Sequence, residues 1–183
     1  MTIFRYIDPP FNFNHPDIAK YPPEVTGNHL LKSMATRLGW SGFTHRRLLD
    51  VGCGVRFAQT IANLDLDFHC YAGIDVNAQV IRWLQEALPG PKFRFAHIDT
   101  QNPMYNPAGR PLEAHAKLPF ADENFDAVCM FSVITHQAPS EAAAILSSIR
   151  NSVATQHLHG HCRFERRRLR RSGSRQSSPS QHL

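Results

Sequence analysis

Long hydrophobic runs are missing from this sequence of 183 residues. No apolar stretch approaches the roughly 20 residues that a helix needs to span a bilayer. The opening residues, 1–6, also lack the basic-then-apolar layout of a secretory signal. We therefore expect a protein that acts in solution and has no membrane partner.

Paired cysteines are missing as well. The four cysteines include no C-x-x-C pair and no spacing typical of a disulfide scaffold. Cys53, Cys70 and Cys129 lie in or beside apolar runs, where a free thiol behaves as a small hydrophobic side chain. The remaining one, Cys162, stands beside three histidines at 157–161, a spacing too tight to close a tetrahedral zinc site. We expect no metal, and a reducing cytoplasm is the simplest compartment.

Lysine and aspartate are absent after Ala154, where the chain carries seven of its 20 basic residues and one of its 15 acidic residues. The rest of the chain therefore has 13 basic and 14 acidic residues and is close to neutral. The net charge of +5 belongs to this tail, 155–183. Only the tail could attract a nucleic acid, and we do not expect one as a partner.

The middle of the chain is rich in patterned hydrophobic residues. Hydrophobic residues make up 42% of the sequence and charged residues 19%, which favours a globular domain over disorder. Strand-like apolar runs alternate with stretches of helical spacing, and this alternation predicts an α/β fold with a parallel sheet. We expect strands at 48–51, 69–75, 93–98 and 125–133, and helices at 29–38, 57–64, 78–88 and 140–153.

Two segments break the pattern. Residues 1–28 are rich in proline and aromatic side chains, so a long helix is not expected there. Residues 99–118 form an irregular insertion with three prolines and a glycine. A loop this long inside a compact domain is usually functional or disordered, and we favour a role near the site because it follows the third strand.

The strongest local motif is the run Asp50-Val51-Gly52-Cys53-Gly54. A strand that ends in glycines lets the backbone approach a ligand, and the next helix offers free N–H groups. A dinucleotide fingerprint would need glycine or alanine at position 57, where this chain has Phe57. An acid just before the turn would repel a pyrophosphate but suits the positively charged amino acid end of S-adenosylmethionine. The motif resembles motif I of class I S-adenosylmethionine-dependent methyltransferases, although Arg56 replaces the usual third glycine.

The resemblance covers roughly residues 30–154 and implies a doubly wound, Rossmann-like sheet with strand order 3-2-1-4 and helices on both faces. It implies that S-adenosylmethionine is the cofactor and that a small molecule of unidentified structure accepts the methyl group. The segment 118–126, Leu-Pro-Phe…Phe-Asp, is similar to one common among the small-molecule enzymes of this class. Asp126, at its end, is expected to pair locally.

The resemblance also assigns cofactor-binding residues to the ends of the strands. Asp75, with Val76 beside it, ends the second strand and would accept both ribose hydroxyls. Asp99 ends the third strand and would bind the adenine amino group. Phe131 falls at the end of the fourth. The full predicted cofactor set is Asp50, Gly52, Cys53, Gly54, Asp75, Val76, Asp99 and Phe131.

His136 follows the fourth strand, near the point where a methyl group would be transferred. An imidazole there could take a proton from an attacking oxygen or nitrogen. A histidine that only hydrogen-bonds backbone at the strand-to-helix turn is the reading we favour, since many such enzymes rely on proximity and alignment. His136 is the only catalytic candidate.

Two other function classes are compatible with the sequence. One is a nicotinamide-dependent oxidoreductase, against which Phe57 argues. The other is a noncatalytic binding protein whose basic tail engages RNA, through the arginines of 166–171. The acceptor and the oligomeric state are not readable from the residues.

The tail departs from the family pattern. The resemblance implies a seven-stranded sheet, of which the expected elements supply four strands. After residue 154 the sequence turns abruptly to His, Arg and Ser, as an out-of-frame translation would. We expect a truncated or frameshifted methyltransferase, the alternative being a short variant with a disordered basic tail. The expected organisation is an irregular segment 1–28, a partial methyltransferase domain 29–154 and a tail 155–183.

Overall fold

We describe the protein from a computed structural model. The structure describes residues 7–10, 21–111, 113, 117–120, 124–134 and 137–154. The tail 155–183, with its predicted disorder and its possible zinc and phosphate ligands, lies outside the described residues, as does most of segment 1–20.

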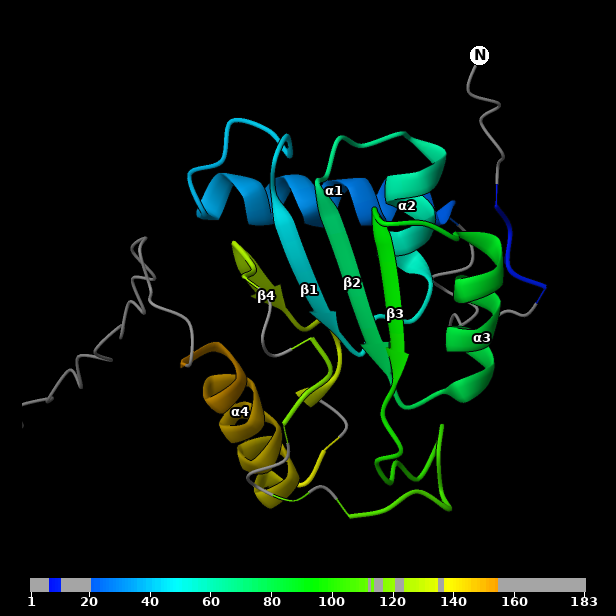
Figure 1. The fold of residues 1–183 in the computed structure, drawn as a ribbon, viewed down its shortest axis with the longest axis vertical. Coiled ribbons are helices and arrows are strands. Elements are labelled where there is room, and N and C mark those ends of the chain that lie inside the picture. The colour runs from blue at the N-terminus through cyan, green and yellow to red at the C-terminus, as the bar shows by residue number, and fades with distance from the viewer. Residues whose placement is uncertain are drawn as a thin grey trace, which may run out of the picture.

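Strands and helices alternate through the described part of the chain, as the sequence predicts. Figure 1 shows one twisted sheet with helices packed around it. In chain order the elements are α1 (Pro23–Arg37), β1 (Arg47–Val51), α2 (Arg56–Asn63), β2 (Cys70–Asp75), α3 (Ala78–Ala87), β3 (Phe93–His97), β4 (Ala127–Cys129) and α4 (Pro139–Ala154).

The sheet is parallel throughout, with the order β3-β2-β1-β4. This confirms the predicted fold class and strand order. The order reverses direction at β1, so the carboxyl ends of β1 and its neighbours form the edge at which open α/β sheets bind ligands. In Figure 1 this edge points downward, at the arrowheads of β1, β2 and β3.

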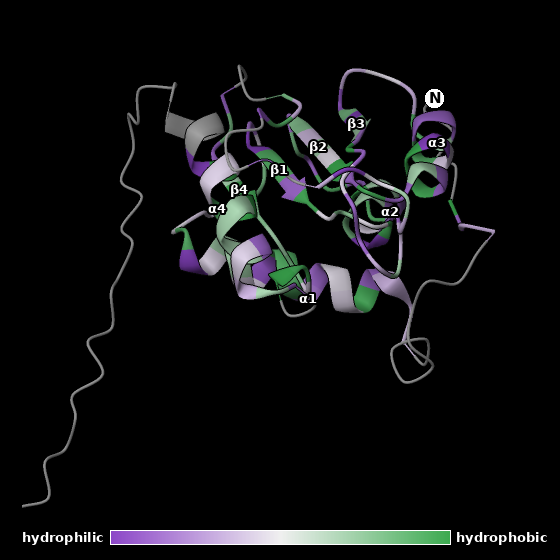
Figure 2. Cartoon of the chain, turned by 90° about the horizontal axis from the view of Figure 1, so that it is seen from below, coloured by the Kyte–Doolittle hydropathy of each residue, from purple (hydrophilic) through white to green (hydrophobic). Residues whose placement is uncertain are grey.

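Helices cover both faces of the sheet, because successive side chains of a strand point to opposite sides. On one face, Leu48 of β1 packs with buried side chains of α1, α2 and α3, such as Leu31, Ile61 and Leu84. On the other face, Leu49 packs with a smaller apolar cluster that Ile149 of α4 contacts. Figure 2 shows hydrophobic residues interspersed with hydrophilic ones along both the strands and the helices.

The first helix begins earlier than expected, at Pro23 instead of residue 29. The structure therefore corrects the expectation that all of 1–28 is irregular. Proline stands at the first helical position, where its missing N–H costs no hydrogen bond. Gly27 lets α1 approach α2, because a Cβ there would overlap the hydroxyl of Thr60.

The fourth strand is much shorter than the predicted 125–133. Before it, Phe125 stacks on Arg47, and the carboxylate of Asp126 accepts hydrogen bonds from Arg46 and from the backbone N–H of Arg47. Asp126 therefore has a structural pairing, but with residues 80 and 79 positions away in the sequence and not with local ones as expected. After it, Ser132 adopts a left-handed φ of 58°, which ends the extended backbone.

The start of the insertion, residues 99–111, folds into a compact loop beyond β3. Isolated bridges join Thr100 to Arg110 and Asn102 to Asn106. The side chain of Asn102 also accepts the backbone N–H groups of Met104 and Tyr105, at 3.0 Å each, and so builds the turn from within. This part is ordered without being a regular element.

None of the helices in the described part of the chain has the length and apolar composition that crossing a membrane would require.

Candidate functional site

The turn after β1 carries the two glycines of the motif. Gly52 has φ +73° and Gly54 has φ +48°, a left-handed backbone that favours glycine. A Cβ at Gly52 would also overlap the side chain of Val133, which follows β4 and closes over the turn. Gly52 is therefore required by the shape of the turn, and the backbone at Gly54 favours glycine, although Arg56 departs from the family pattern.

Asp75 joins this turn to the one after β2. One of its carboxylate oxygens, Oδ2, accepts the backbone N–H of Gly54 at 2.8 Å, and the other, Oδ1, accepts the N–H of Asn77 at 2.8 Å. The side chain is half-buried. A carboxylate offers about four acceptor positions, so two remain for further donors.

Asn77 begins α3 immediately afterwards. Its side-chain oxygen accepts the N–H groups of Gln79 and Val80, at 3.0 and 3.2 Å, which are the free donors of the first helical turn. In contrast, no side chain caps the first turn of α2. The N–H groups at the start of α2 are thus available to an anion, in the same turn as Gly54.

Asp50 lies inside the protein, with only 2% of its surface exposed. Its Oδ2 accepts the hydroxyl of Tyr71 at 2.7 Å, and its Oδ1 accepts the thiol of Cys129 at 3.4 Å. No basic residue of the described chain forms an ion pair with it. The three groups come from the adjacent strands β2, β1 and β4 and lie on one face of the sheet.

Burial raises the pKa of Asp50 from 3.8 to about 6. The hydrogen bonds from Tyr71 and Cys129 favour the charged form and oppose that rise, whereas the negative charge of Asp75 adds to it. A carboxyl group with this pKa is mostly charged at neutral pH, and the buried charge lowers the stability of the folded protein. A cation bound beside it would remove that cost.

Cys53 turns its side chain away from the turn and into the core. It is 6% exposed, and its sulfur would lie 2.8 Å from a Cβ added at Gly73. Its backbone N–H donates to the carbonyl of Ile74 at 3.1 Å. Burial raises the pKa of the thiol well above its ordinary value, so it stays protonated. Its predicted contact with a cofactor stays a prediction.

The remaining predicted residues lie around the same edge of the sheet. Val76 follows β2, and its carbonyl accepts a hydrogen bond from Nε2 of His97 at 3.1 Å. Asp99 follows β3 and is engaged within its own loop, by Asn106 at 3.1 Å and Arg110 at 3.6 Å. Their roles toward a cofactor stay predictions.

Phe131 lies two residues beyond β4, in a bend and not within a strand as expected. It is 38% exposed, and its ring meets Phe57 of α2 edge to face at 5.1 Å between centroids. An apolar ring therefore borders the turn on the side of α2. His136, the catalytic candidate, lies outside the described residues.

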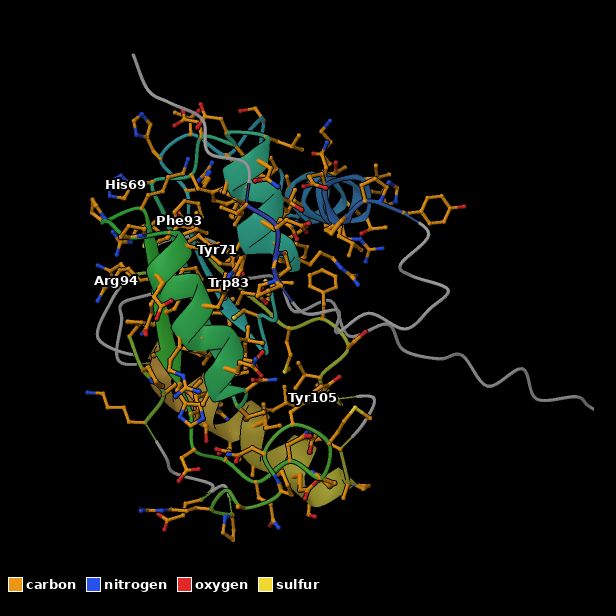
Figure 3. All side chains as sticks on the ribbon, turned by 90° about the vertical axis from the view of Figure 1, so that its right-hand side faces the viewer. His69, Tyr71, Trp83, Phe93, Arg94 and Tyr105 are labelled. Atoms are coloured by element: carbon orange, nitrogen blue, oxygen red, sulfur yellow. The ribbon has the colours of Figure 1, made fainter. Side chains whose placement is uncertain are left out.

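An open cavity of about 330 Å³ lies at the other edge of the sheet, where the strands begin. Figure 3 shows two of its residues, His69 and Arg94, apart from Tyr105, which follows β3. None of the residues that line the cavity belongs to the glycine turn. It is lined by Arg47, His69, Cys70, Pro91, Lys92 and Arg94.

Sequence reasoning missed three residues that shape the site: Tyr71, Val133 and Asn77. Asn77 carried a readable signal, since an asparagine before a helical stretch is a helix cap. Tyr71 and Val133 carried no such signal. Each meets the site only because the fold brings its part of the chain next to the first strand or the turn after it.

The sequence itself matches a known family. A family model described as a methyltransferase domain matches residues 49–155, which is more than half of the chain. The protein therefore belongs to the methyltransferase domain family, and the resemblance seen in motif I is confirmed at this level. The matched range begins one residue before Asp50 and includes both carboxylates of the site.

Several solved structures resemble the chain. A magnesium protoporphyrin IX methyltransferase of Synechocystis PCC 6803, with bound S-adenosylmethionine, is 19% identical, with a TM-score of 0.48 over 79% of this chain and 60% of that one. The amino pentose methyltransferase CalS10 of Micromonospora echinaspora is 18% identical, with a TM-score of 0.45 over 78% and 53%. DesVI of Streptomyces venezuelae is 17% identical, with a TM-score of 0.43 over 75% and 52%. The chain spans between about half and three fifths of each of these.

Proposed function

We propose that this protein binds S-adenosylmethionine and transfers its methyl group to a small molecule. The observation that carries the proposal is the pair of carboxylates, Asp50 and Asp75, at the ends of adjacent parallel strands, joined through the glycine turn by the Gly54 N–H. Two carboxylates beside one turn disfavour a phosphate ligand and favour a cation.

The residues at this edge match the parts of the cofactor. Asp75 retains free acceptor positions for the two ribose hydroxyls. The uncapped N-terminus of α2 suits the carboxylate of the methionine moiety, and buried Asp50 suits its ammonium group. Asp99 is our candidate for the adenine amino group, since it follows β3 on the same edge.

When bound, S-adenosylmethionine supplies an electrophilic methyl group on a positively charged sulfur. The contribution of the chain is to hold the cofactor and align it with the acceptor. Phe57 and Phe131 offer an apolar border beside the turn, which would help to exclude water. His136 remains a hypothesis for a base, and nothing in the proposed binding of the cofactor depends on it.

We further infer that the protein works in the cytoplasm. Cys53, Cys70 and Cys129 are buried free thiols in the described chain, which is the usual state of cysteine in a reducing compartment. A small-molecule acceptor is supported by the resemblance of segment 118–126 to small-molecule enzymes of the class.

Calorimetric titration of S-adenosylhomocysteine and NAD into the wild type and Asp75→Ala tests the proposal. We expect the wild type to bind S-adenosylhomocysteine and Asp75→Ala to bind it at least about tenfold more weakly, because hydrogen bonds to a charged group contribute roughly 1.5–3 kcal/mol each. His136→Ala should bind it as the wild type does.

Asp65→Ala is the matched control, because Asp65 is an exposed aspartate that pairs with Lys92 at the far edge of the sheet. It should leave the affinity unchanged. Binding of NAD without binding of S-adenosylhomocysteine would overturn the proposed function in favour of an oxidoreductase.

A further inference from the structure

The polar group inside the sheet, Tyr71 with Asp50 and Cys129, is not explained by packing. Tyr71 has no exposed surface, and it stands among the aromatic rings of Phe93 and Phe95 beneath α3. Figure 3 shows Tyr71 and Phe93 on this side of the sheet. A phenylalanine would fill the same space, so the hydroxyl has another role.

That role is defined by register. Tyr71 pairs with Leu48 in the sheet, two residues before Asp50, and its side chain extends toward the carboxyl edge to meet the Asp50 carboxylate. Cys129 pairs with Asp50 directly and meets the other oxygen. Both donors reach Asp50 from neighbouring strands, so its carboxylate is fixed in position before any ligand arrives.

We propose that Tyr71 is a positioning residue for the cofactor: its buried hydroxyl holds the Asp50 carboxylate charged and oriented below the glycine turn, where it receives the ammonium group of S-adenosylmethionine. This inference rests on the proposed function and deepens it, because it assigns recognition of the amino acid end of the cofactor to a side chain outside motif I.

The electrostatics of the site support this assignment. The ionisable groups that act on Asp50 are Tyr71, Cys129, Cys53 and Asp75, and none of them is a cation. The two hydrogen bonds are thus the only favourable contacts that the charged form of Asp50 has among the described residues. Removing the stronger one should shift Asp50 toward its neutral form, which binds an ammonium group poorly.

Two ligands separate this role from a structural one. S-adenosylhomocysteine carries the amino acid end, whereas 5′-methylthioadenosine has the same nucleoside without it. At pH 7 we expect Tyr71→Phe to bind S-adenosylhomocysteine about tenfold more weakly, as expected for loss of one charge-assisted hydrogen bond. The same variant should bind 5′-methylthioadenosine as the wild type does.

The pH profile gives a second measurement on the wild type alone. The ammonium group of the ligand stays mostly protonated below about pH 7.5. Wild-type affinity for S-adenosylhomocysteine should fall as the pH drops through about 6, where Asp50 takes up a proton, and the midpoint should lie higher in Tyr71→Phe. Histidines also titrate in this range. The ratio of the two ligands' affinities is therefore the quantity to compare.

A double-mutant cycle closes the test. In the background of Asp50→Asn, Tyr71→Phe should have no further effect on S-adenosylhomocysteine, because the residue through which it acts is already neutral. Equal weakening of both ligands by Tyr71→Phe, or an undiminished effect in the Asp50→Asn background, would overturn the positioning role alone. A wild type that binds neither ligand would overturn the proposed function itself.

Discussion

The turns after β1 and β2 look alike in sequence, but their aspartates differ in burial and in the groups that hydrogen-bond to them. Each contains an aspartate at the end of a buried parallel strand, Asp50 in one and Asp75 in the other. Asp75 is half-buried and accepts hydrogen bonds from two backbone N–H groups. Asp50 is buried and accepts its hydrogen bonds from two side chains of other strands.

This difference distinguishes Asp75, whose carboxylate connects two turns of the fold, from Asp50, whose carboxylate is positioned before a ligand binds. Backbone donors and partial exposure stabilise the charge of Asp75 while it ties two turns together. Asp50 has no comparable structural task, and burial raises its pKa to about 6. A buried charge without a counter-ion is unfavourable in the free protein, so we interpret Asp50 as a group selected for a ligand.

The largest effect should come from the glycine turn that separates the two carboxylates. Gly52→Ala should lower the free energy of unfolding by about 2–4 kcal/mol, because a left-handed backbone costs an L-residue roughly 1–2 kcal/mol and the new methyl overlaps Val133. Urea unfolding measures it.

Gly54→Ala is the matched control for that change. Its φ is also positive, at +48°, but no atom lies within 4 Å of an added Cβ. It should lose only the strain, about 1 kcal/mol. Equal losses in the two variants would show that Val133 does not close over the turn.

The charge of Asp50 should produce an effect of opposite sign. A pKa raised from 3.8 to about 6 means that the folded state favours the neutral carboxyl group. This contribution to stability is complete below about pH 4 and is lost as the pH rises through 6. At pH 8 the free energy of unfolding of Asp50→Asn should therefore exceed that of the wild type by about 2–3 kcal/mol, measured by urea unfolding. At pH 3 the two proteins should nearly match.

The same variant should lose affinity for S-adenosylhomocysteine, so that stability rises while binding falls. Asp75→Asn is the comparison, since Asp75 has its backbone donors and no buried charge to relieve. It should not be more stable than the wild type at pH 8. A stability gain at Asp75 equal to that at Asp50 would erase the distinction between the two turns.

The sequence predicted the elements best where the apolar run and the strand end at the same residue. The strand before Asp50 and the strand before Asp75 were placed within one residue at each end, because buried parallel strands are short apolar runs with turn residues after them. The fourth strand was drawn too long, because the apolar residues after Cys129 continue the pattern while the chain bends away. The start of α1 was missed because the prolines of 1–28, Pro23 among them, argued against a helix, whereas Pro23 stands at the first position of this one.

For the site, the sequence located the glycine motif but not the side chains of other strands that contact it. Gly52 and Gly54 could be predicted, because glycine in such a turn has a local cause that needs no partner. The hydrogen bond from Tyr71 to Asp50 could not, because it depends on a sheet register that joins residues 21 positions apart. Likewise, the sequence placed Asp50 directly before the glycine turn but carried no sign of its burial, which the structure shows.

The smallest effect should come from the start of α3, beside Asp75. Asn77→Ala removes the acceptor for the N–H groups of Gln79 and Val80, and a lost N-cap costs about 1 kcal/mol. The backbone N–H of residue 77 still donates to Asp75 after this change, so the Asp75 carboxylate keeps both of its backbone partners. We therefore expect a small loss of stability in urea unfolding and an unchanged affinity for S-adenosylhomocysteine. Asn77→Ser, which keeps a capping oxygen, should recover most of the stability. Suppose the Ala variant instead loses affinity as strongly as Asp75→Ala does. The position of the Asp75 carboxylate would then depend on a neighbouring side chain, as that of Asp50 does. The two turns would no longer differ in how their carboxylates are held.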